Sequence, residues 1–242
     1  MSAVVITPTT GIPELADAIR SVAAQTEKVE HWIVIDGIEN ADKVIQICKD
    51  NNYGQKIIAL PENTGRPARH HLGEGRKYNG HRIYGAMSFL VNHDHVFLLD
   101  EDNWFDPIHC ETMLNNLRNM NTEWCYSLRK IFDQSGNYVC NDDCDSLGIY
   151  PNRSRIPFVD MNCYCFKAGF FADLAPWLCG ELHADKTLFQ VAVAKMERHY
   201  QFCSTGIYTV NYRARPDMVD DWFLKGNEII KNFYGDKKPW AV

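Results

Sequence analysis

The strongest constraint on the fold is a repeated alternation of short apolar runs and helical patterns in the first part of the chain. The first run is β-branched and ends at Pro8, and the apolar residues after it recur at helical spacing. The patterns predict strands at 3–8, 31–35, 55–60 and 95–99, and helices at 15–23, 43–48 and 83–91. This order predicts an α/β fold whose mostly parallel sheet carries helices on both faces.

One more helix is expected after the fourth strand, and the pattern changes beyond it. Asp106-Pro107 is typical of a helix start, and this helix is expected to continue to about Met120. The turn residues 134–137 lie between two apolar runs and predict an antiparallel hairpin. Beyond it we expect a loop at 140–156, strands at 158–166 and 206–212, and helices at 168–178 and 184–197. The length of 242 residues favours a single domain over residues 1–242.

The charge, the cysteines and the apolar runs of the sequence limit which partners and which cellular compartment are expected. The net charge of -6 argues against a broad attraction to nucleic acid, so no nucleic-acid partner is expected. Nine scattered cysteines favour free thiols in a reducing compartment. The N-terminus lacks the pattern of a secretory signal, and no apolar run has the roughly 18–20 residues of a membrane span. We therefore expect a cytoplasmic protein without a membrane span.

The most informative segment is the apolar strand at 95–99 with the acidic residues that follow it. Side chains alternate along a strand, so Asp100 and Asp102 are expected on one side and Glu101 on the other. Two carboxylates at the carboxyl end of a strand repel each other, and a divalent cation relieves the repulsion. The segment predicts a Mn²⁺ or Mg²⁺ site, and the alternative is a group of acids that only solvates a loop.

These motifs resemble a known family. The Asp-x-Asp strand end, with VVITPTTG at the start and HWIVIDG at the second strand, resembles the nucleotide-sugar-dependent glycosyltransferases of the GT-A fold, particularly the inverting family 2. The resemblance covers about residues 3–200. It implies a GT-A (Rossmann-like) sheet with a nucleotide-binding half at 1–103 and an acceptor-binding half with a C-terminal tail at 104–242.

The resemblance also implies roles for the residues at the strand ends. Thr7, Pro8, Thr9 and Asp36 would hold the nucleotide base, usually uracil. Asp102 would be the direct metal ligand, with Asp100 near the ribose and the metal, and Glu101 belongs to the same nucleotide-sugar-binding group. The alternatives are ordinary strand-end hydroxyls for the two threonines and a turn acid for Asp36.

A basic, glycine-containing segment lies before the Asp-x-Asp strand. It departs from the Ala-Arg-Asn-x-Gly form that many family members show. Gly80 and His81 are the preferred contacts to the nucleotide sugar, because they begin the buried helix. The basic side chains suit phosphates, although a solvated basic loop is an equal alternative; they are Arg66, Arg69, Lys77 and Arg82.

An inverting transfer also needs a base for the acceptor hydroxyl. In the family this base is an acid at the start of a late helix, and Asp185 fits that position best. Glu181 and His183 remain rivals. The alternative for Asp185 is an acid that only interacts with the helix dipole.

Three further groups carry weaker predictions. Asn162, in the Asp160-Met161-Asn162 segment of an apolar run, is expected to line the donor or acceptor pocket. Arg213 and Arg215 follow the last strand and are candidates for the diphosphate. Four cysteines lack the usual zinc spacing, so buried thiols are the better interpretation; they are Cys140, Cys144, Cys163 and Cys165.

The sequence thus predicts a metal-dependent hexosyltransferase of polysaccharide or glycan biosynthesis. It would move a sugar, with inversion, from a UDP-sugar to a carbohydrate or lipid-linked hydroxyl. A sugar nucleotidyltransferase is one rival, although the loop after the first strand lacks a basic glycine-rich motif. A non-catalytic nucleotide- or carbohydrate-binding protein is the other. The aromatic tail is expected to pack on the domain, with acceptor covering or homodimer formation as alternatives.

Overall fold

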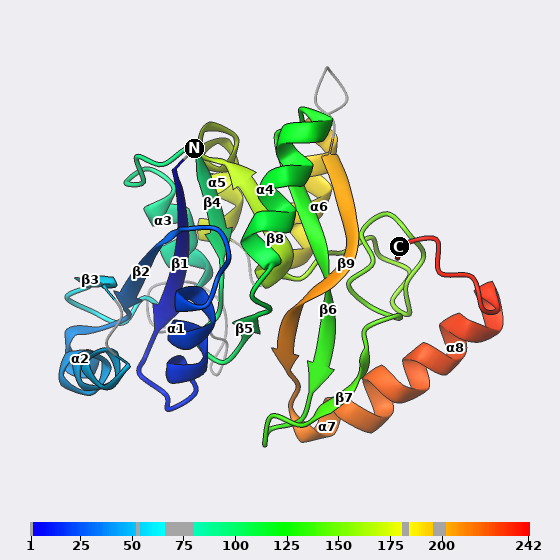
Figure 1. Ribbon diagram of the computed structural model, residues 1–242, viewed down its shortest axis with the longest axis horizontal. Helices are drawn as coiled ribbons and strands as arrows, with labels where there is room; N and C mark the ends of the chain where they lie inside the picture. Colours follow the sequence, from blue (N-terminus) through cyan, green and yellow to red (C-terminus); the bar gives the residue numbers. More distant parts are fainter. Residues whose placement is uncertain (1, 52–53, 66–79, 181–183, 196–201) are drawn as a thin grey trace.

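One sheet runs through both halves of the chain. The computed structural model describes residues 2–51, 54–65, 80–180, 184–195 and 202–242. In these ranges nine strands form one sheet in the order β3-β2-β1-β4-β8-β6-β9-β5, and β7 pairs with β6 (Figure 1). The strands are β1 (Ala3–Thr9), β2 (Glu30–Ile35), β3 (Lys56–Ala59), β4 (His95–Leu98), β5 (Trp104–Phe105), β6 (Trp124–Phe132), β7 (Tyr138–Asn141), β8 (Tyr164–Lys167) and β9 (Phe202–Arg213).

The first four strands of the sheet, β3-β2-β1-β4, are parallel. Ile6 of β1 lies opposite Trp32 of β2 and Leu98 of β4. Backbone hydrogen bonds continue past the strand ends, from Asp36 N–H to the Thr9 carbonyl and from Leu99 N–H to the Ile6 carbonyl. The loops after β1, β2 and β4 therefore meet at one edge of the sheet, where ligands bind in open α/β sheets.

The second half of the sheet is mixed. β8 is antiparallel to both β4 and β6, whereas β9 is parallel to β6 and antiparallel to β5. β6 and β7 form the antiparallel hairpin expected around residues 134–137. The predicted α/β class, with a parallel first half and an antiparallel hairpin in the second, is confirmed.

Helices cover both faces of the sheet. α3, α5 and α6 lie on one face, and α1, α2 and α4 lie on the other (Figure 1). Neighbouring residues of β6 show this division: Trp124 packs edge-on against Phe189 of α6, and the Cys125 thiol donates to the Met113 carbonyl of α4. The helices of the two layers are α1 (Leu15–Ala23), α2 (Ala41–Asp50), α3 (His81–Met87), α4 (His109–Met120), α5 (Ala168–Gly180) and α6 (Ala184–Lys195).

Two local predictions were wrong at element boundaries. The strand expected at 158–166 begins only at Tyr164, because Asp160 caps a short 3₁₀ helix by accepting from the Asn162 N–H. The helix expected at Asp106 begins at His109. Here the carboxylate of Asp106 accepts from Lys130 and Asn211 instead of capping the helix, and β5 precedes it.

The C-terminal segment packs on the second half of the sheet. It contains α7 (Pro216–Met218), a π-helical turn (Val219–Leu224) and α8 (Lys225–Tyr234). Phe223 and Trp240 are buried, which agrees with the expected packing of the tail, whereas Phe233 is exposed. None of the helices in the described ranges combines the length and the apolar character that a bilayer crossing requires.

Gly80 begins α3 directly against β1. Its φ of +80° is left-handed, and a Cβ on it would lie 2.9 Å from Cβ of Pro8. We expect Gly80→Ala to lower the free energy of unfolding by about 1–3 kcal/mol, because both the backbone and the contact become strained. Urea denaturation measures this effect. Gly54→Ala is the matched control, since a Cβ there meets nothing within 4 Å; equal losses in the two variants would contradict the prediction.

Candidate functional site

The two acids of the Asp-x-Asp segment lie in a turn, not in the strand. β4 ends at Leu98, so strand alternation does not set the directions of the side chains that follow. The charge of Asp102 raises the pKa of Asp100, and the charge of Glu101 raises that of Asp102. The Glu101 carboxylate accepts hydrogen bonds from the loop after β1.

Asp100 is fixed by donors on both of its carboxylate oxygens. The Tyr84 hydroxyl, on α3, donates to Oδ1 at 2.9 Å, and the Asn162 amide donates to Oδ2 at 3.0 Å. Burial, with the charges of Asp102 and Asp160, raises the pKa of Asp100 to about 7 despite these two bonds. A negative charge is therefore unfavourable here without a cation.

Asp102 differs in having a carboxylate that is little used by the protein. Burial is the main cause that raises the pKa of Asp102 to about 6, and Glu101 and Asp160 add to it. Its own backbone N–H and the positive charge of Arg213 act in the opposite direction. Arg213 donates to the backbone carbonyl of Asp102, and no side chain among the described residues donates to its carboxylate, so the carboxylate oxygens are available to a ligand.

Glu101 joins the loop after β1 to the acidic turn. Its carboxylate accepts from the hydroxyls of Thr9 (2.5 Å) and Thr10 (3.0 Å). The backbone N–H groups of Thr10, Gly11 and Ile12 also point at it. Glu101 and Thr9 thus contact each other, and the hydrogen bonds of Glu101 hold the acidic turn and the loop after β1 together.

The other predicted base-binding residues occupy distinct positions along β1 and β2. Thr7 is fully buried and shares a 2.9 Å hydrogen bond with His31, so it lies inside the sheet. Pro8 packs against Gly80 at the start of α3. Asp36, at the end of β2, is also buried, and its carboxylate accepts from the Thr64 N–H at 2.6 Å.

The basic segment is described only at its ends. Arg82 of α3 donates to the Thr64 carbonyl at 3.4 Å, so the helix start and the loop beside Asp36 are adjacent. His81, the first residue of α3, is partly buried. Several predicted contacts lie outside the described residues: Arg66, Arg69, Lys77, Glu181 and His183.

The candidate base and the candidate diphosphate ligands lie on different elements. The backbone of Asp185 is in the first turn of α6, as expected for a helix-start acid. Arg213 stacks over Trp104 and donates hydrogen bonds to the Asp17 carboxylate and to the Asp102 carbonyl. Its guanidinium therefore stabilises the backbone of the acidic turn. It also lines an open polar hollow of about 480 Å³, which neither acid of the Asp-x-Asp pair lines. Arg215 is largely exposed beside Asp217.

The cysteines do not form a metal centre in the described residues. Cys144, Cys163 and Cys165 are buried free thiols, and Cys140 is half-buried. Within the same ranges no group of three or more His, Cys, Asp or Glu side chains is close enough to hold an ion alone. A cation at Asp100 and Asp102 would thus take its other ligands from a bound molecule and water.

That arrangement fits Mn²⁺ or Mg²⁺. Such hard cations prefer oxygen ligands, and Mg²⁺ is commonly held by one or two carboxylates together with substrate phosphates. No described side chain donates to the carboxylate of Asp102, and burial together with neighbouring acids raises the pKa of both Asp100 and Asp102. The residues present therefore fit a metal that binds together with a diphosphate.

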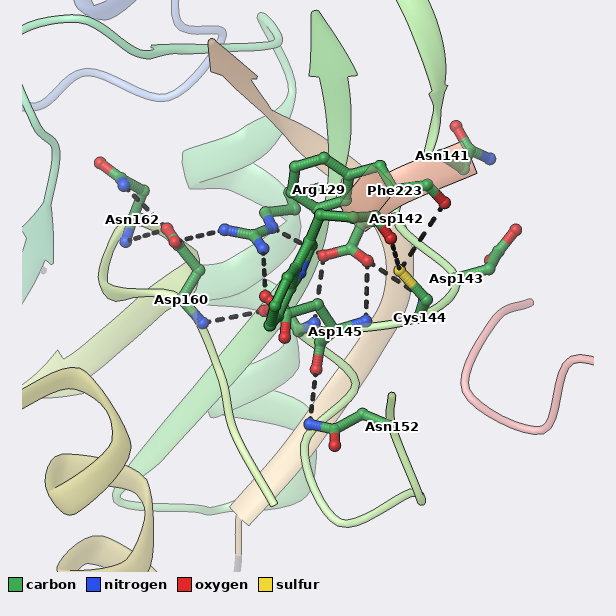
Figure 2. Close-up of polar contacts among 12 residues, drawn as sticks. Arg129, Asn141, Asp142, Asp143, Cys144, Asp145, Asn152, Asp160, Asn162 and Phe223 are labelled. Atoms are coloured by element: carbon green, nitrogen blue, oxygen red, sulfur yellow. Dashed lines mark hydrogen bonds and ion pairs between the residues drawn. The ribbon is translucent and has the colours of Figure 1, made fainter. Parts of the chain in front are cut away.

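Sequence reasoning missed two residues around this site, Tyr84 and Arg129. The signal for Tyr84 was a phenol in a buried helix, which needs a hydrogen-bond partner. Arg129 is a charged residue within an apolar strand, and it is fully enclosed by Asp142, Asp145 and Asp160 (Figure 2). A buried guanidinium requires such partners, but their positions in the chain gave no indication of which acids they are.

Comparison with solved structures shows a shared fold. The crystal structure of residues 1–349 of S. aureus TarS has a TM-score of 0.63 and 11% identity, over 88% of this chain and 60% of that one. Its complex with UDP has a TM-score of 0.60 and 12% identity, over 90% and 62%. Its complex with UDP-GlcNAc has a TM-score of 0.63 and 12% identity, over 89% and 59%.

The crystallised TarS chain is longer than this chain, which spans about 60% of it. No family model matches the sequence, and a search of curated proteins finds no match. Only the comparison of structures therefore relates this chain to known proteins, and the shared fold agrees with the predicted GT-A-type architecture.

Proposed function

We propose that this protein is a metal-dependent glycosyltransferase that uses a nucleoside diphosphate sugar, with UDP as the nucleotide. One observation carries the proposal. Two half-buried carboxylates, Asp100 and Asp102, whose pKa values are raised, lie at the carboxyl edge of a parallel sheet, beside the loop after β1. The fold is shared with TarS, whose crystal structures include complexes with UDP and UDP-GlcNAc.

The proposed chemistry divides between a metal and the protein. A cation bound at Asp102 and near Asp100 would neutralise the departing diphosphate as a Lewis acid. Tyr84 and Asn162 hold the Asp100 carboxylate, and Glu101 keeps the loop after β1 next to the acidic turn. Asp185, with Glu181 and His183 as rivals, would take the proton of a carbohydrate or lipid-linked hydroxyl during inversion.

The direct test combines the protein with UDP-GlcNAc or other UDP-sugars and Mn²⁺, and measures UDP release with and without acceptor. We expect UDP release that stops when EDTA removes the metal. Release of pyrophosphate from UTP and a sugar phosphate would instead identify a sugar nucleotidyltransferase. Nucleotide binding without turnover across an acceptor array would identify a non-catalytic protein. Either result would overturn the proposal.

The raised pKa values predict how metal binding depends on pH. Protonation of Asp100 and Asp102 stabilises the metal-free fold at low pH, and this contribution is lost as the pH rises through about 6 to 7. A cation needs the ionised carboxylates. We therefore expect Mn²⁺ with UDP to raise Tm more at about pH 8 than at about pH 5.5. Differential scanning fluorimetry measures this, and an equal shift at the two pH values would contradict it.

A further inference from the structure

The Arg129 side chain, in the second half of the chain, is held firmly in place by its contacts. It lies on β6 with 2% of its side chain exposed, and each guanidinium nitrogen donates to a different carboxylate. The contacts are Nε to Asp142 at 2.7 Å, Nη2 to Asp145 at 2.8 Å and Nη1 to Asp160 at 2.5 Å (Figure 2). Tyr212 lies against the guanidinium plane, 4.3 Å from ring centre to Cζ. The guanidinium has little freedom to turn.

Asp160 connects Arg129 to Asn162, because its two carboxylate oxygens contact different residues. Oδ2 accepts from Arg129, while Oδ1 accepts from the Asn162 backbone N–H at 3.0 Å and from the Asn162 amide at 2.8 Å. Figure 2 shows these contacts, through which Asp160 restrains the Asn162 amide.

Asn162 in turn holds Asp100 at two points. Its amide nitrogen donates to Asp100 Oδ2 at 3.0 Å, and its amide oxygen accepts from the Asp100 backbone N–H at 2.6 Å. Asn162 is fully buried, and both of its amide hydrogens are used by Asp100 and Asp160. It therefore lies behind Asp100 instead of facing a ligand.

We propose that Asp160 and Asn162 are positioning residues. They connect Arg129 to Asp100, and they hold the Asp100 carboxylate in the orientation that a diphosphate-bound cation requires. The inference rests on the proposed function, since it concerns the same metal site. Its physical basis is general: groups that orient a metal-binding carboxylate remove rotations that metal binding would otherwise have to freeze. Residues from the second half of the chain thereby orient a carboxylate of the proposed metal site.

The first test compares two neutral deletions of a buried asparagine. Asn162→Ala removes the contacts to Asp100. Asn152→Ala is its matched control, because Asn152 is also buried but donates to the Asp145 and Ile156 carbonyls. The readout is Mn²⁺ affinity with saturating UDP, from the electron paramagnetic resonance signal of free Mn²⁺. We expect Asn162→Ala to weaken binding roughly 10- to 100-fold and Asn152→Ala to leave it within about 3-fold.

The second test compares two acids of the same cluster. Asp160→Asn and Asp145→Asn each remove one charge that faces Arg129, and both side chains are 12% exposed. An asparagine at 160 has an NH₂ donor in place of one of the two carboxylate oxygens, so either the contact to Arg129 or the contacts to Asn162 lose their acceptor. We expect weaker Mn²⁺ binding for Asp160→Asn than for Asp145→Asn, by roughly 10-fold or more. This pair also tests the link if Asn162→Ala does not fold.

The outcomes separate the inference from the proposed function. If the wild-type protein takes up no Mn²⁺ with UDP, the proposed function falls and the inference with it. If the wild-type protein binds Mn²⁺ and the members of each pair bind it equally, only the inference is overturned. Metal-free stability, measured by urea denaturation, separates loss of positioning from loss of fold.

Discussion

Asp102→Asn is expected to lower sugar transfer by roughly 10²–10³-fold while the metal-free protein becomes more stable. The transfer falls because a cation contributes several kcal/mol to stabilising the departing diphosphate. The stability rises because burial and neighbouring acids make the ionised carboxylate unfavourable, as the raised pKa of about 6 shows. The two effects have opposite signs, which ordinary damage to a fold does not produce.

The measurements are UDP release from a UDP-sugar with Mn²⁺, and urea denaturation with EDTA near neutral pH. Asp236→Asn is the matched control, because the Asp236 side chain is 95% exposed and lies in the C-terminal tail. We expect that control to change neither quantity. Transfer at the wild-type rate by Asp102→Asn would remove the metal from the proposed reaction.

Arg129→Met is expected to lower the free energy of unfolding by about 3–5 kcal/mol. The variant leaves Asp142, Asp145 and Asp160 without their shared cation inside the protein. Burial by itself disfavours the charged guanidinium, but the three aspartates outweigh burial and raise the pKa of Arg129 well above its usual value. Removing one partner of such a group leaves buried charges uncompensated, and their cost is large.

Urea denaturation at neutral pH measures this loss. Arg118→Met is the matched control, since Arg118 is exposed on α4 and donates to Asn115. Arg129 lowers the pKa of Asp145, so without the arginine this acid takes up a proton at a higher pH than in the wild type. The loss in Arg129→Met is therefore expected to shrink as the pH falls from neutral. A loss as small as that of the control would show that the cluster contributes little net stability.

The sequence predicted much of the first half because its signals are local. The β-branched runs, the helical spacing between them and the acids after the fourth run each depend on residues that are close in the chain. The parallel arrangement follows from their alternation, and it places Asp36 and Asp100 at one edge of the sheet. The hairpin at β6 and β7 was equally local, since turn residues lie between two apolar runs.

The environment of those acids was decided by contacts between distant parts of the chain. Asp100 meets Tyr84 and Asn162 only because the fold brings both α3 and the turn before β8 to the acidic turn after β4. Glu101 was grouped with the nucleotide-binding residues, but the structure gives its carboxylate to the hydroxyls and N–H groups of the loop after β1. No spacing rule connects residues 90 positions apart.

The sequence by itself thus determined the class of fold and the edge of the sheet where carboxylates gather, because periodicity and strand ends are properties of short segments. Only the tertiary structure decided which carboxylate is fixed and which remains open to a ligand. It also revealed that a buried arginine in the second half is linked to the acid in the first. The reason is that hydrogen-bond partners and burial depend on how elements pack, and packing brings together residues that the order of the chain keeps apart.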